Sequence, residues 1–264
     1  MKDFFKFLFS LLGINIGYSV SKVDIVLFIK DLWPQKTNFE LIRLGPDTDG
    51  GYLVPDDLEN IEACFSPGVD LISDFEMECY NRGMQLFLAD KSVDKPNLKI
   101  ADKEYHFTKK FIGTINNEDL ITIDNWISSA NIDSSSDLLL QMDIEGNEYS
   151  SLLTISNELM KRFRIIVIEF HDLNKIWNKE FFRLAQSVFL KILDTHVCVH
   201  IHPNNCCGTD VQKGIEIPKV AEFTFLRKDR ITSLNNSTKF PHKYDFDNTE
   251  AKSIDLPKIW YKQS

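Results

Sequence analysis

Short apolar runs alternate with amphipathic segments of helical period along most of this sequence. Such alternation predicts parallel β-strands joined by crossover helices, which is an α/β fold with helices on both faces of the sheet. Ligands of such sheets bind beyond the carboxyl ends of the strands, so the residues that follow each run are the site candidates. The predicted strands are residues 63–65, 85–89, 107–112, 138–142, 165–170, 197–201 and 222–226, and the predicted helices are residues 73–82, 117–130, 148–161 and 179–193.

Two further elements precede this core. Residues 22–32 have helical period, and the helix should stop at Trp33-Pro34 because proline disfavours a helical residue before it. Residues 39–44 predict a strand that runs into a turn-rich loop, residues 45–51, where glycines let bare backbone approach a ligand. We expect an N-terminal helical segment (1–38), a core domain (39–234) and a C-terminal extension (235–264) that serves as a lid or an oligomer contact.

Residues 4–20 are apolar enough to suggest a signal peptide or a membrane span, but Lys6, Asn15 and two glycines interrupt them. The stretch is also shorter than the roughly 20 apolar residues of a spanning helix, and no small-residue cleavage site follows it. We favour a packing or dimerising helix over peripheral membrane contact, and both over a cleaved signal. No stable membrane insertion is expected, and a homo-oligomer fits the dimerising alternative.

Composition narrows the class of protein further. The chain has 264 residues, 43% of them hydrophobic, which suits one catalytic-sized core. Its net charge of -9 disfavours binding to nucleic acid or anionic lipid. The five cysteines are odd in number and lack a regular spacing, so we expect reduced thiols in the cytoplasm. A zinc site at Cys206-Cys207 is the weaker alternative, because no second cysteine pair accompanies it.

The first two predicted core strands end in residues that suit an adenosyl or phosphate ligand. After the first strand, Ser66-Pro67-Gly68 forms a small-residue turn that opens a helix, where backbone N–H groups can approach such a ligand. After the second strand comes Asp90, where dinucleotide-type folds hold the ribose hydroxyls. An ordinary turn and a helix cap are the structural alternatives for these two positions.

Polar side chains gather after the next strands. Asp143 follows the fourth strand, with Glu145 and Gly146 close behind it. Glu169 and His171 share one face of the fifth strand by the two-residue period. The sixth strand adds a similar pair, His200 and His202. A single strand histidine is more often a hydrogen-bonded core residue. Several histidines and carboxylates that converge on one rim, however, indicate a functional site.

These residues resemble the FkbM-type methyltransferase family over residues 43–227. The resemblance rests on four segments, and one departure is that the chain has Ser66-Pro67-Gly68 where the family commonly shows a more glycine-rich turn. The segments are Asp49-Gly50-Gly51-Tyr52-Leu53-Val54-Pro55, Met142-Asp143-Ile144-Glu145-Gly146-Asn147-Glu148, Ile168-Glu169-Phe170-His171 and His200-Ile201-His202-Pro203-Asn204-Asn205.

The resemblance implies a Rossmann-like, seven-stranded, mostly parallel sheet, the class I methyltransferase fold, with S-adenosylmethionine as cofactor. It also implies O-methylation of a small-molecule hydroxyl, and we expect a nucleotide-linked sugar or a surface-polysaccharide precursor as the acceptor. Residues 39–234 would then be the methyltransferase domain. The cofactor-binding positions implied by the resemblance are Asp49, Tyr52, Ser66, Gly68, Glu76, Asp90 and Lys91.

Methyl transfer from a sulfonium to a hydroxyl needs in-line alignment and removal of the hydroxyl proton. Candidate general bases are Glu169 and the three rim histidines, with Asp143 as the orienting carboxylate. Alternatively a divalent metal acidifies the hydroxyl, held by Asp143, His171 and His202 as a two-histidine, one-carboxylate set. Fe²⁺, Mn²⁺ and Mg²⁺ all fit, and the position of Asp143 resembles where catechol O-methyltransferases hold magnesium.

Two other classes of protein were weighed against this prediction. A nucleotide-sugar dehydrogenase or epimerase would need a G-x-G-x-x-G turn after the first core strand, and the sequence lacks one. A noncatalytic binding module would lack the polar cluster on the fifth and sixth strands.

Overall fold

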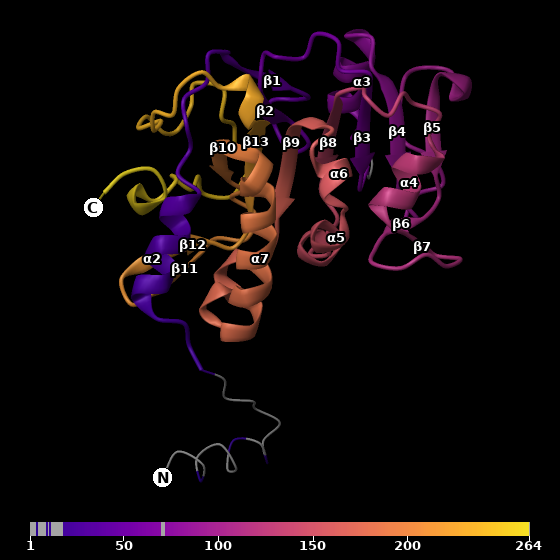
Figure 1. The fold of residues 1–264 in the computed structure, drawn as a ribbon. Helices are drawn as coiled ribbons and strands as arrows, with labels where there is room; N and C mark the ends of the chain where they lie inside the picture. The colour runs from indigo at the N-terminus through magenta and orange to yellow at the C-terminus, as the bar shows by residue number, and fades with distance from the viewer. Residues whose placement is uncertain (1–3, 5–8, 10, 12–17, 70–71, 264) are drawn as a thin grey trace.

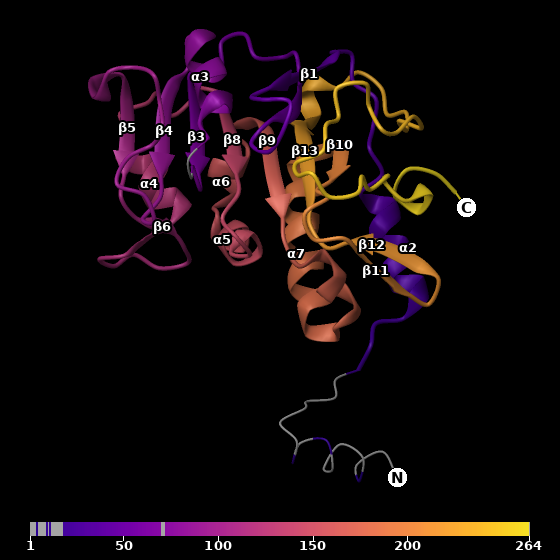
Figure 2. The ribbon, with the colours of Figure 1, turned by 180° about the vertical axis from the view of Figure 1, so that it is seen from behind.

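A computed structural model describes residues 4, 9, 11, 18–69 and 72–263, and its centre is a seven-stranded sheet (Figures 1 and 2). All seven predicted core strands are present, so the predicted α/β fold is confirmed. Their order across the sheet is β10-β13-β9-β8-β3-β4-β5. The strands are β3 (Ala63–Pro67), β4 (Gln85–Ala89), β5 (Tyr105–Thr108), β8 (Leu138–Met142), β9 (Phe163–Phe170), β10 (His196–Pro203) and β13 (Ala221–Arg227).

The strand directions decide which side chains share an edge. Strands β5, β4, β3, β8 and β9 pair in parallel, whereas β13 pairs antiparallel with both β9 and β10. The carboxyl ends of the parallel strands therefore meet at one edge. Because β13 lies between them, β9 and β10 are not neighbours in the sheet.

Helices cover both faces of the sheet. Helix α3 (Asp74–Asn81) and the hairpin of β1 (Leu41–Leu44) and β2 (Tyr52–Pro55) pack into the hydrophobic cluster on one face. Helix α7 (Lys179–Thr195) packs on the other face through apolar residues spaced three and four apart, and Asn178 caps its first turn. The other helices of that face are α2 (Lys22–Asp31), α4 (Ile123–Ser129), α5 (Glu148–Thr154) and α6 (Asn157–Met160).

Several predicted boundaries were wrong. Residues 107–112 are not one strand, because β5 ends at Thr108 and β6 (Phe111–Ile112) pairs instead with β7 (Leu120–Ile121). Residues 148–161 form two helices, since the Ser156 side chain caps α6 and the Ser156 amide donates to Asp124. The predicted helix 117–130 begins only at Ile123, after the N-cap Thr122. The sequence analysis also missed β2 and the hairpin of β11 (Thr209–Gln212) and β12 (Ile215–Pro218).

Both chain ends pack against the domain where the structure describes them. On α2, Phe28 makes edge contacts with the rings of Phe182 and Phe189 on α7. The Trp33 indole donates to the carbonyl of Ile259, which belongs to a 3-10 turn near the C-terminus. The predicted apolar segment, residues 4–20, lies mostly outside the described residues. Short 3-10 turns complete the element list: Asp102–Glu104, Leu173–Trp177, Lys228–Arg230 and Lys258–Trp260.

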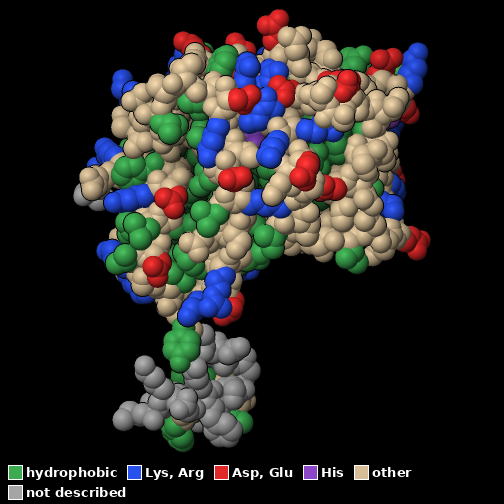
Figure 3. Space-filling model, in the orientation of Figure 1, with side chains coloured by type: hydrophobic (Ala, Val, Ile, Leu, Met, Phe, Trp, Pro, Cys, Tyr) green, Lys and Arg blue, Asp and Glu red, His purple; other side chains and the backbone are tan. Residues whose placement is uncertain are grey.

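The described surface mixes charges of both signs. On the face shown in Figure 3, lysine and arginine side chains lie next to aspartate and glutamate, without a continuous basic tract. Lys175 pairs with Asp172, for example, and Arg183 pairs with Glu180. Among the described helices, none combines the length and the apolar character that a bilayer crossing requires.

The expectation that all five cysteines are reduced thiols is wrong for two of them. Cys206 and Cys207 are joined by a disulfide, while Cys64, Cys79 and Cys198 are free and buried. The tight turn after β10 brings the two adjacent sulfurs together, and the Cys206 amide donates to the Asn204 side chain in that turn. Each of these two sulfurs is bonded to the other, so neither is a free thiolate that could bind zinc. This removes the basis for a zinc site there.

Candidate functional site

The loop after β3 needs a glycine at position 68. Gly68 has a φ of +85°, and a Cβ atom there would lie 1.6 Å from the carbonyl oxygen of Asp143. The Asp143 amide donates in turn to the carbonyl of Pro67. This close approach joins the ends of β3 and β8, so the first predicted cofactor loop and the Asp143 motif border one space.

That space is a small pocket at the carboxyl edge of the sheet. Four of the predicted cofactor residues line it: Asp49, Tyr52, Gly68 and Glu76. Asp143 lines it as well, so the predicted cofactor-binding residues and the candidate catalytic carboxylate line the same pocket. The remaining lining residues are Gly50, Val69, Ile72 and Gln141.

Two buried carboxyl and hydroxyl groups lie beneath this pocket. The Ser66 hydroxyl lies 2.5 Å from Glu76 Oε1 and 2.6 Å from Gln141 Oε1. Burial raises the pKa of Glu76 to about 7, although the contact with Ser66 opposes this shift. Ser66 therefore supports the pocket floor from below, and Glu76 is the residue of this pair that lines the pocket.

Asp90 and Lys91 occupy different positions relative to the pocket. The Gly68 amide donates to the carbonyl of Ala89, which places Asp90 beside the first loop. Asp90 Oδ1 accepts hydrogen bonds from the amide and hydroxyl of Ser92. Lys91 instead pairs with Asp119. The geometry keeps Asp90 next to Gly68 but directs the Lys91 ammonium to another partner.

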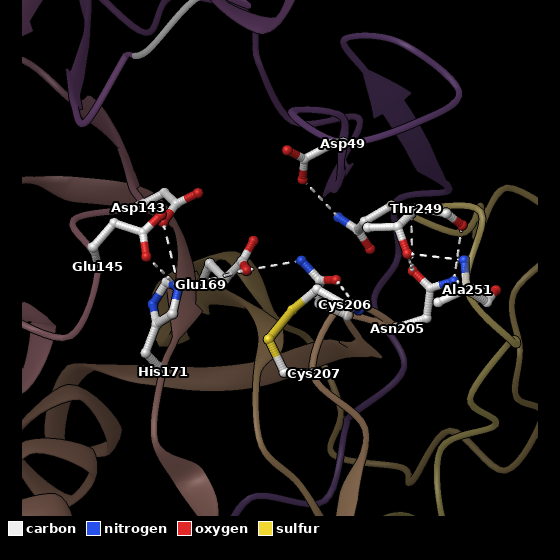
Figure 4. The surroundings of a disulfide bond; sticks show 12 residues. Asp49, Asp143, Glu145, Glu169, His171, Asn205, Cys206, Cys207, Thr249 and Ala251 are labelled. Carbon is white, nitrogen blue, oxygen red and sulfur yellow. Dashed lines mark hydrogen bonds and ion pairs between the residues drawn. A yellow bond between two sulfur atoms is a disulfide. The ribbon is translucent and has the colours of Figure 1, made fainter.

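Four polar residues converge at the ends of β8 and β9. His171 Nε2 lies 3.4 Å from Glu145 Oε2, 3.9 Å from Asp143 Oδ1 and 3.8 Å from Glu169 Oε1 (Figure 4). One ligand atom each from Asp143, Glu145 and His171 lies within 4.8 Å of the others, the spacing of a possible metal site among the described residues. Asp143 Oδ1 is buried and has no hydrogen-bond partner among those residues.

Glu148 fixes the orientation of His171. Its Oε1 accepts hydrogen bonds from the amides of Ile144 and Gly146 and lies 3.2 Å from His171 Nδ1. With Nδ1–H donating to this buried carboxylate, Nε2 faces Asp143 and Glu145. Glu145 itself has a φ of +55°, so the turn after β8 adopts a left-handed residue to bring its carboxylate beside the imidazole.

Burial and charge shift the pKa values of this group strongly. Burial raises the pKa of Asp143 to about 7, with His171 opposing the shift. Burial alone would lower the pKa of His171, but the hydrogen bond to Glu148 and the nearby carboxylates outweigh it and raise the value to about 9. Burial and the charge of Asp143 raise the pKa of Glu169 well above its usual range.

The two histidines of β10 lie apart from this group. His200 Nε2 lies 2.8 Å from Asp245 Oδ1, and His202 Nε2 donates to the carbonyl of Phe246 at 2.9 Å. His202 is therefore not brought together with Asp143 and His171 as the predicted metal set required. The first reason is the strand order, because β13 separates β10 from β9. The second is that Asp245 and Phe246 of the C-terminal extension are the hydrogen-bond partners of the two imidazoles.

The sequence analysis missed residues that only the fold brings to this edge. Glu148 was treated only as a helix start, whereas its carboxylate turns back to the amides of Ile144 and Gly146. Glu222 lies opposite Glu169 in the β13–β9 pairing, and Asn248 comes from the C-terminal extension. Asn204 donates to Glu169 Oε1 at 2.9 Å. The last three contacts depend on strand order and carried no local sequence signal.

Comparison with known proteins gives one family match. Residues 74–195 match the family model described as "Methyltransferase FkbM domain". None of the curated proteins compared with the chain matches it.

Similar solved structures include two of magnesium protoporphyrin IX methyltransferase (ChlM) from Synechocystis PCC 6803, one with bound SAH and one with bound SAM. The first is 9% identical and the match covers 65% of this chain and 76% of that chain, with a TM-score of 0.32. The second is 8% identical, with coverage of 65% and 72% and a TM-score of 0.32.

Proposed function

We propose that this chain, whose residues 74–195 match the family model described as "Methyltransferase FkbM domain", transfers the methyl group of S-adenosylmethionine to a hydroxyl group of a sugar. One observation carries the proposal. The pocket lined by Gly68 and Glu76 also contains Asp143, whose neighbours His171 and Glu169 can handle a proton. A methyl-donor loop and proton-handling groups thus share one edge of the sheet.

Bound S-adenosylmethionine would supply an electrophilic methyl group. The chain's contribution is to hold it: Asp49, Tyr52 and Gly68 border the pocket. Asp90, which follows the Ala89 carbonyl that accepts from the Gly68 amide, would accept hydrogen bonds from the ribose hydroxyls. His171 Nε2 is the group placed to take the hydroxyl proton, because Glu148 engages Nδ1, and with a pKa of about 9 its neutral, proton-accepting form prevails only at alkaline pH. Glu169 and Asp143 surround the imidazole and would stabilise it once protonated.

A divalent metal is the alternative way to acidify the hydroxyl. The donor set fits one: two carboxylates and an imidazole, an unpartnered Asp143 Oδ1, and Glu148 holding the far side of His171. Asp143, Glu145 and His171 would hold the ion, with Glu145 in place of His202. The ion would lower the pKa of a hydroxyl bound to it. Mg²⁺, Mn²⁺ and Fe²⁺ suit this mixed set.

The acceptor we propose is a nucleotide-linked sugar or a surface-polysaccharide precursor in the cytoplasm, with no nucleic acid as substrate. The net charge of -9 supports a small-molecule acceptor over an RNA. Another small-molecule hydroxyl is the second candidate. Incubating the protein with labelled S-adenosylmethionine and a panel of nucleotide sugars and RNA tests this, and methylation of RNA alone would overturn it.

Cofactor binding can be tested without an acceptor. S-adenosylhomocysteine should raise the melting temperature, whereas NAD should not. Asp90→Ala should weaken S-adenosylhomocysteine binding by about 1–3 kcal/mol, the order of a lost charged hydrogen bond. Asp94→Ala is the matched control, because Asp94 is exposed and pairs only with Lys109. Stabilisation by NAD instead of S-adenosylhomocysteine would contradict the proposed function.

Metal binding has its own test. Calorimetric titration with Mn²⁺ should show one site that Asp143→Ala or His171→Ala removes and His202→Ala retains. Dialysis against a chelator should abolish turnover and leave S-adenosylhomocysteine affinity nearly unchanged, because that affinity comes from the ends of β3 and β4. Full turnover after verified metal removal would eliminate the metal and leave His171 as a plain general base.

A further inference from the structure

The carboxyl edge holds a second group of acidic and amide side chains beside the proposed methyl-transfer site. Glu169 on β9 lies directly opposite Glu222 on β13, and His202 on β10 lies opposite Glu222 from the other side. Directly opposed residues share a face of the sheet, so these side chains form a row. Glu169 alone belongs also to the group around His171.

Residues 245–251, which we name the C-terminal strap, cover this row. His200 Nε2 lies within hydrogen-bonding distance of Asp245 Oδ1, and His202 Nε2 donates to the carbonyl of Phe246. Asn205 donates to the carbonyls of Thr249 and Ala251, and its own oxygen accepts from the Thr249 amide. Figure 4 shows Asn205, Thr249 and Ala251 linked in this way on the far side of Cys206 from His171. The strap is therefore fixed in place over the strand ends.

The hydrogen bonds within the row leave acceptor atoms without donors. The Asn248 amide nitrogen donates to Glu222 Oε1 at 2.8 Å and to Asp49 Oδ1 at 3.1 Å. Asn204 donates to Glu169 Oε1. Glu169 Oε2 and Asn248 Oδ1 are then buried without a partner among the described residues, and the Glu169 residue is only 3% exposed. Buried polar atoms are normally paired, so these two indicate a missing donor.

We propose that Glu169, Glu222 and Asn248 form an acceptor subsite, and that it takes the hydroxyl- or ammonium-bearing, non-anionic part of the methyl acceptor. This inference rests on the proposed function. The free Asn248 Oδ1 can only accept a hydrogen bond. Hydroxyl and ammonium groups can donate one to it, whereas carboxylate and phosphate groups cannot donate when ionised. The subsite thereby determines which part of the acceptor molecule binds there.

The guanidinium of the neighbouring Arg43 does not offset this preference for non-anionic groups. Arg43 lies near Glu222, but its guanidinium donates to the carbonyls of Pro46, Thr48 and Tyr244. Each of its three nitrogens thus has a backbone acceptor, and the side chain ties the loop after β1 to the residue before the strap. An anionic group in the subsite would face Glu222 and Asp49, while the Arg43 nitrogens are directed to backbone carbonyls.

The test uses three matched sugars and the full chain saturated with S-adenosylhomocysteine. The probes are methyl glucoside, methyl glucosaminide and methyl glucuronoside, which differ in one substituent each. Binding is measured by saturation-transfer NMR at pH 6.5, where the glucosaminide amine is protonated, and at pH 8.5, above the pKa of about 8 that burial gives Glu222. We expect the glucoside or the glucosaminide to bind at least tenfold more tightly than the glucuronoside. Preference for the neutral sugar or for the amine identifies which donor the subsite prefers.

Two variants locate the binding. Asn248→Ala should weaken the preferred sugar at least tenfold, whereas Asn235→Ala, an exposed asparagine nearby in sequence, should leave its affinity unchanged. Glu222→Gln keeps the side-chain shape and should reduce the discrimination against the glucuronoside several-fold. Unchanged S-adenosylhomocysteine affinity in each variant shows that the domain remains folded.

The outcomes separate this inference from the proposed function. Glucuronoside binding as tight as glucoside binding, no binding of any probe, or full sugar affinity in Asn248→Ala would overturn the subsite. Methyl transfer to sugars could still be observed in those cases. Conversely, sugar binding that depends on Asn248, without methylation of any hydroxyl compound, would retain the subsite and contradict the proposed reaction.

Discussion

Gly68 is the residue whose replacement the geometry penalises most directly. In Gly68→Ala the new methyl group would overlap the Asp143 carbonyl, in addition to the cost of a φ of +85°. We expect a loss of roughly 2–5 kcal/mol in the free energy of unfolding from strain and overpacking, together with loss of S-adenosylhomocysteine binding. Urea unfolding and calorimetry measure the two effects.

Gly83 supplies a matched control for this prediction. Its φ is +89°, but a Cβ there meets nothing within 4 Å. Gly83→Ala should therefore cost only about 1–2 kcal/mol, the penalty of the left-handed conformation, and leave cofactor affinity intact. Equal costs at the two positions would show that the β3–β8 approach is not as close as described.

In the proposed reaction Glu148 acts through His171. In Glu148→Gln the amide keeps a hydrogen bond to the backbone but loses the charge beside Nδ1, so the imidazole is held less firmly in the required tautomer. Turnover should fall about 10- to 100-fold, the usual cost of losing such a supporting carboxylate. S-adenosylhomocysteine affinity should stay unchanged, and Glu158→Gln on the exposed side of α6 is the control. A fall in cofactor affinity equal to the fall in turnover would contradict this role.

At the scale of elements, His196 joins the start of β10 to β9. Its Nε2–H donates to the Phe163 carbonyl at 2.7 Å, and Nδ1 accepts from the Thr195 hydroxyl at 2.7 Å. Burial lowers its pKa from 6.5 to about 4, so the folded state requires the neutral ring. Between these two pH values the unfolded chain binds the proton and the folded chain does not, so the stability contributed above pH 6.5 is lost as pH falls.

This linkage predicts a specific pH dependence. The stability difference between the wild type and His196→Gln should shrink by about 3 kcal/mol between pH 7 and pH 4, because one pKa unit corresponds to about 1.4 kcal/mol. Urea unfolding of both proteins at four pH values measures it. The comparison cancels the contributions of Glu76 and Glu222, whose raised pKa values act in the opposite direction. Parallel stability curves for the two proteins would contradict the prediction.

At the scale of the whole molecule, net charge governs which partners approach. With a charge of -9 and both signs interspersed on the surface of Figure 3, the protein should not bind RNA or DNA even at low salt. Fluorescence anisotropy of a labelled RNA should stay flat up to protein concentrations of about 10⁻⁴ M, the weak end of ordinary non-specific affinity. Salt-sensitive binding at micromolar concentration would reveal a local basic patch and reopen a nucleic-acid substrate.

The sequence determined the class of fold and half of the site. Strand runs with a two-residue period and helical stripes fix which residues face inward, and parallel strands must end at one edge, so Asp143, Glu169 and His171 could be placed together in advance. Gly68 followed from the same reasoning, since it comes after a strand end, whereas Glu76 was implied by the resemblance to the FkbM-type family. These conclusions need only local periodicity and chain order.

Only the tertiary structure determined the other half of the site. Nothing local in the sequence shows that β13 inserts between β9 and β10, which removes His202 from the predicted metal set and places Glu222 beside Glu169. The contact of Asn248 with Glu222 spans 26 residues and that with Asp49 spans 199. Side-chain period determines the face on which a residue lies, but strand order and the path of the C-terminal segment determine its neighbours, and both depend on packing of the whole chain.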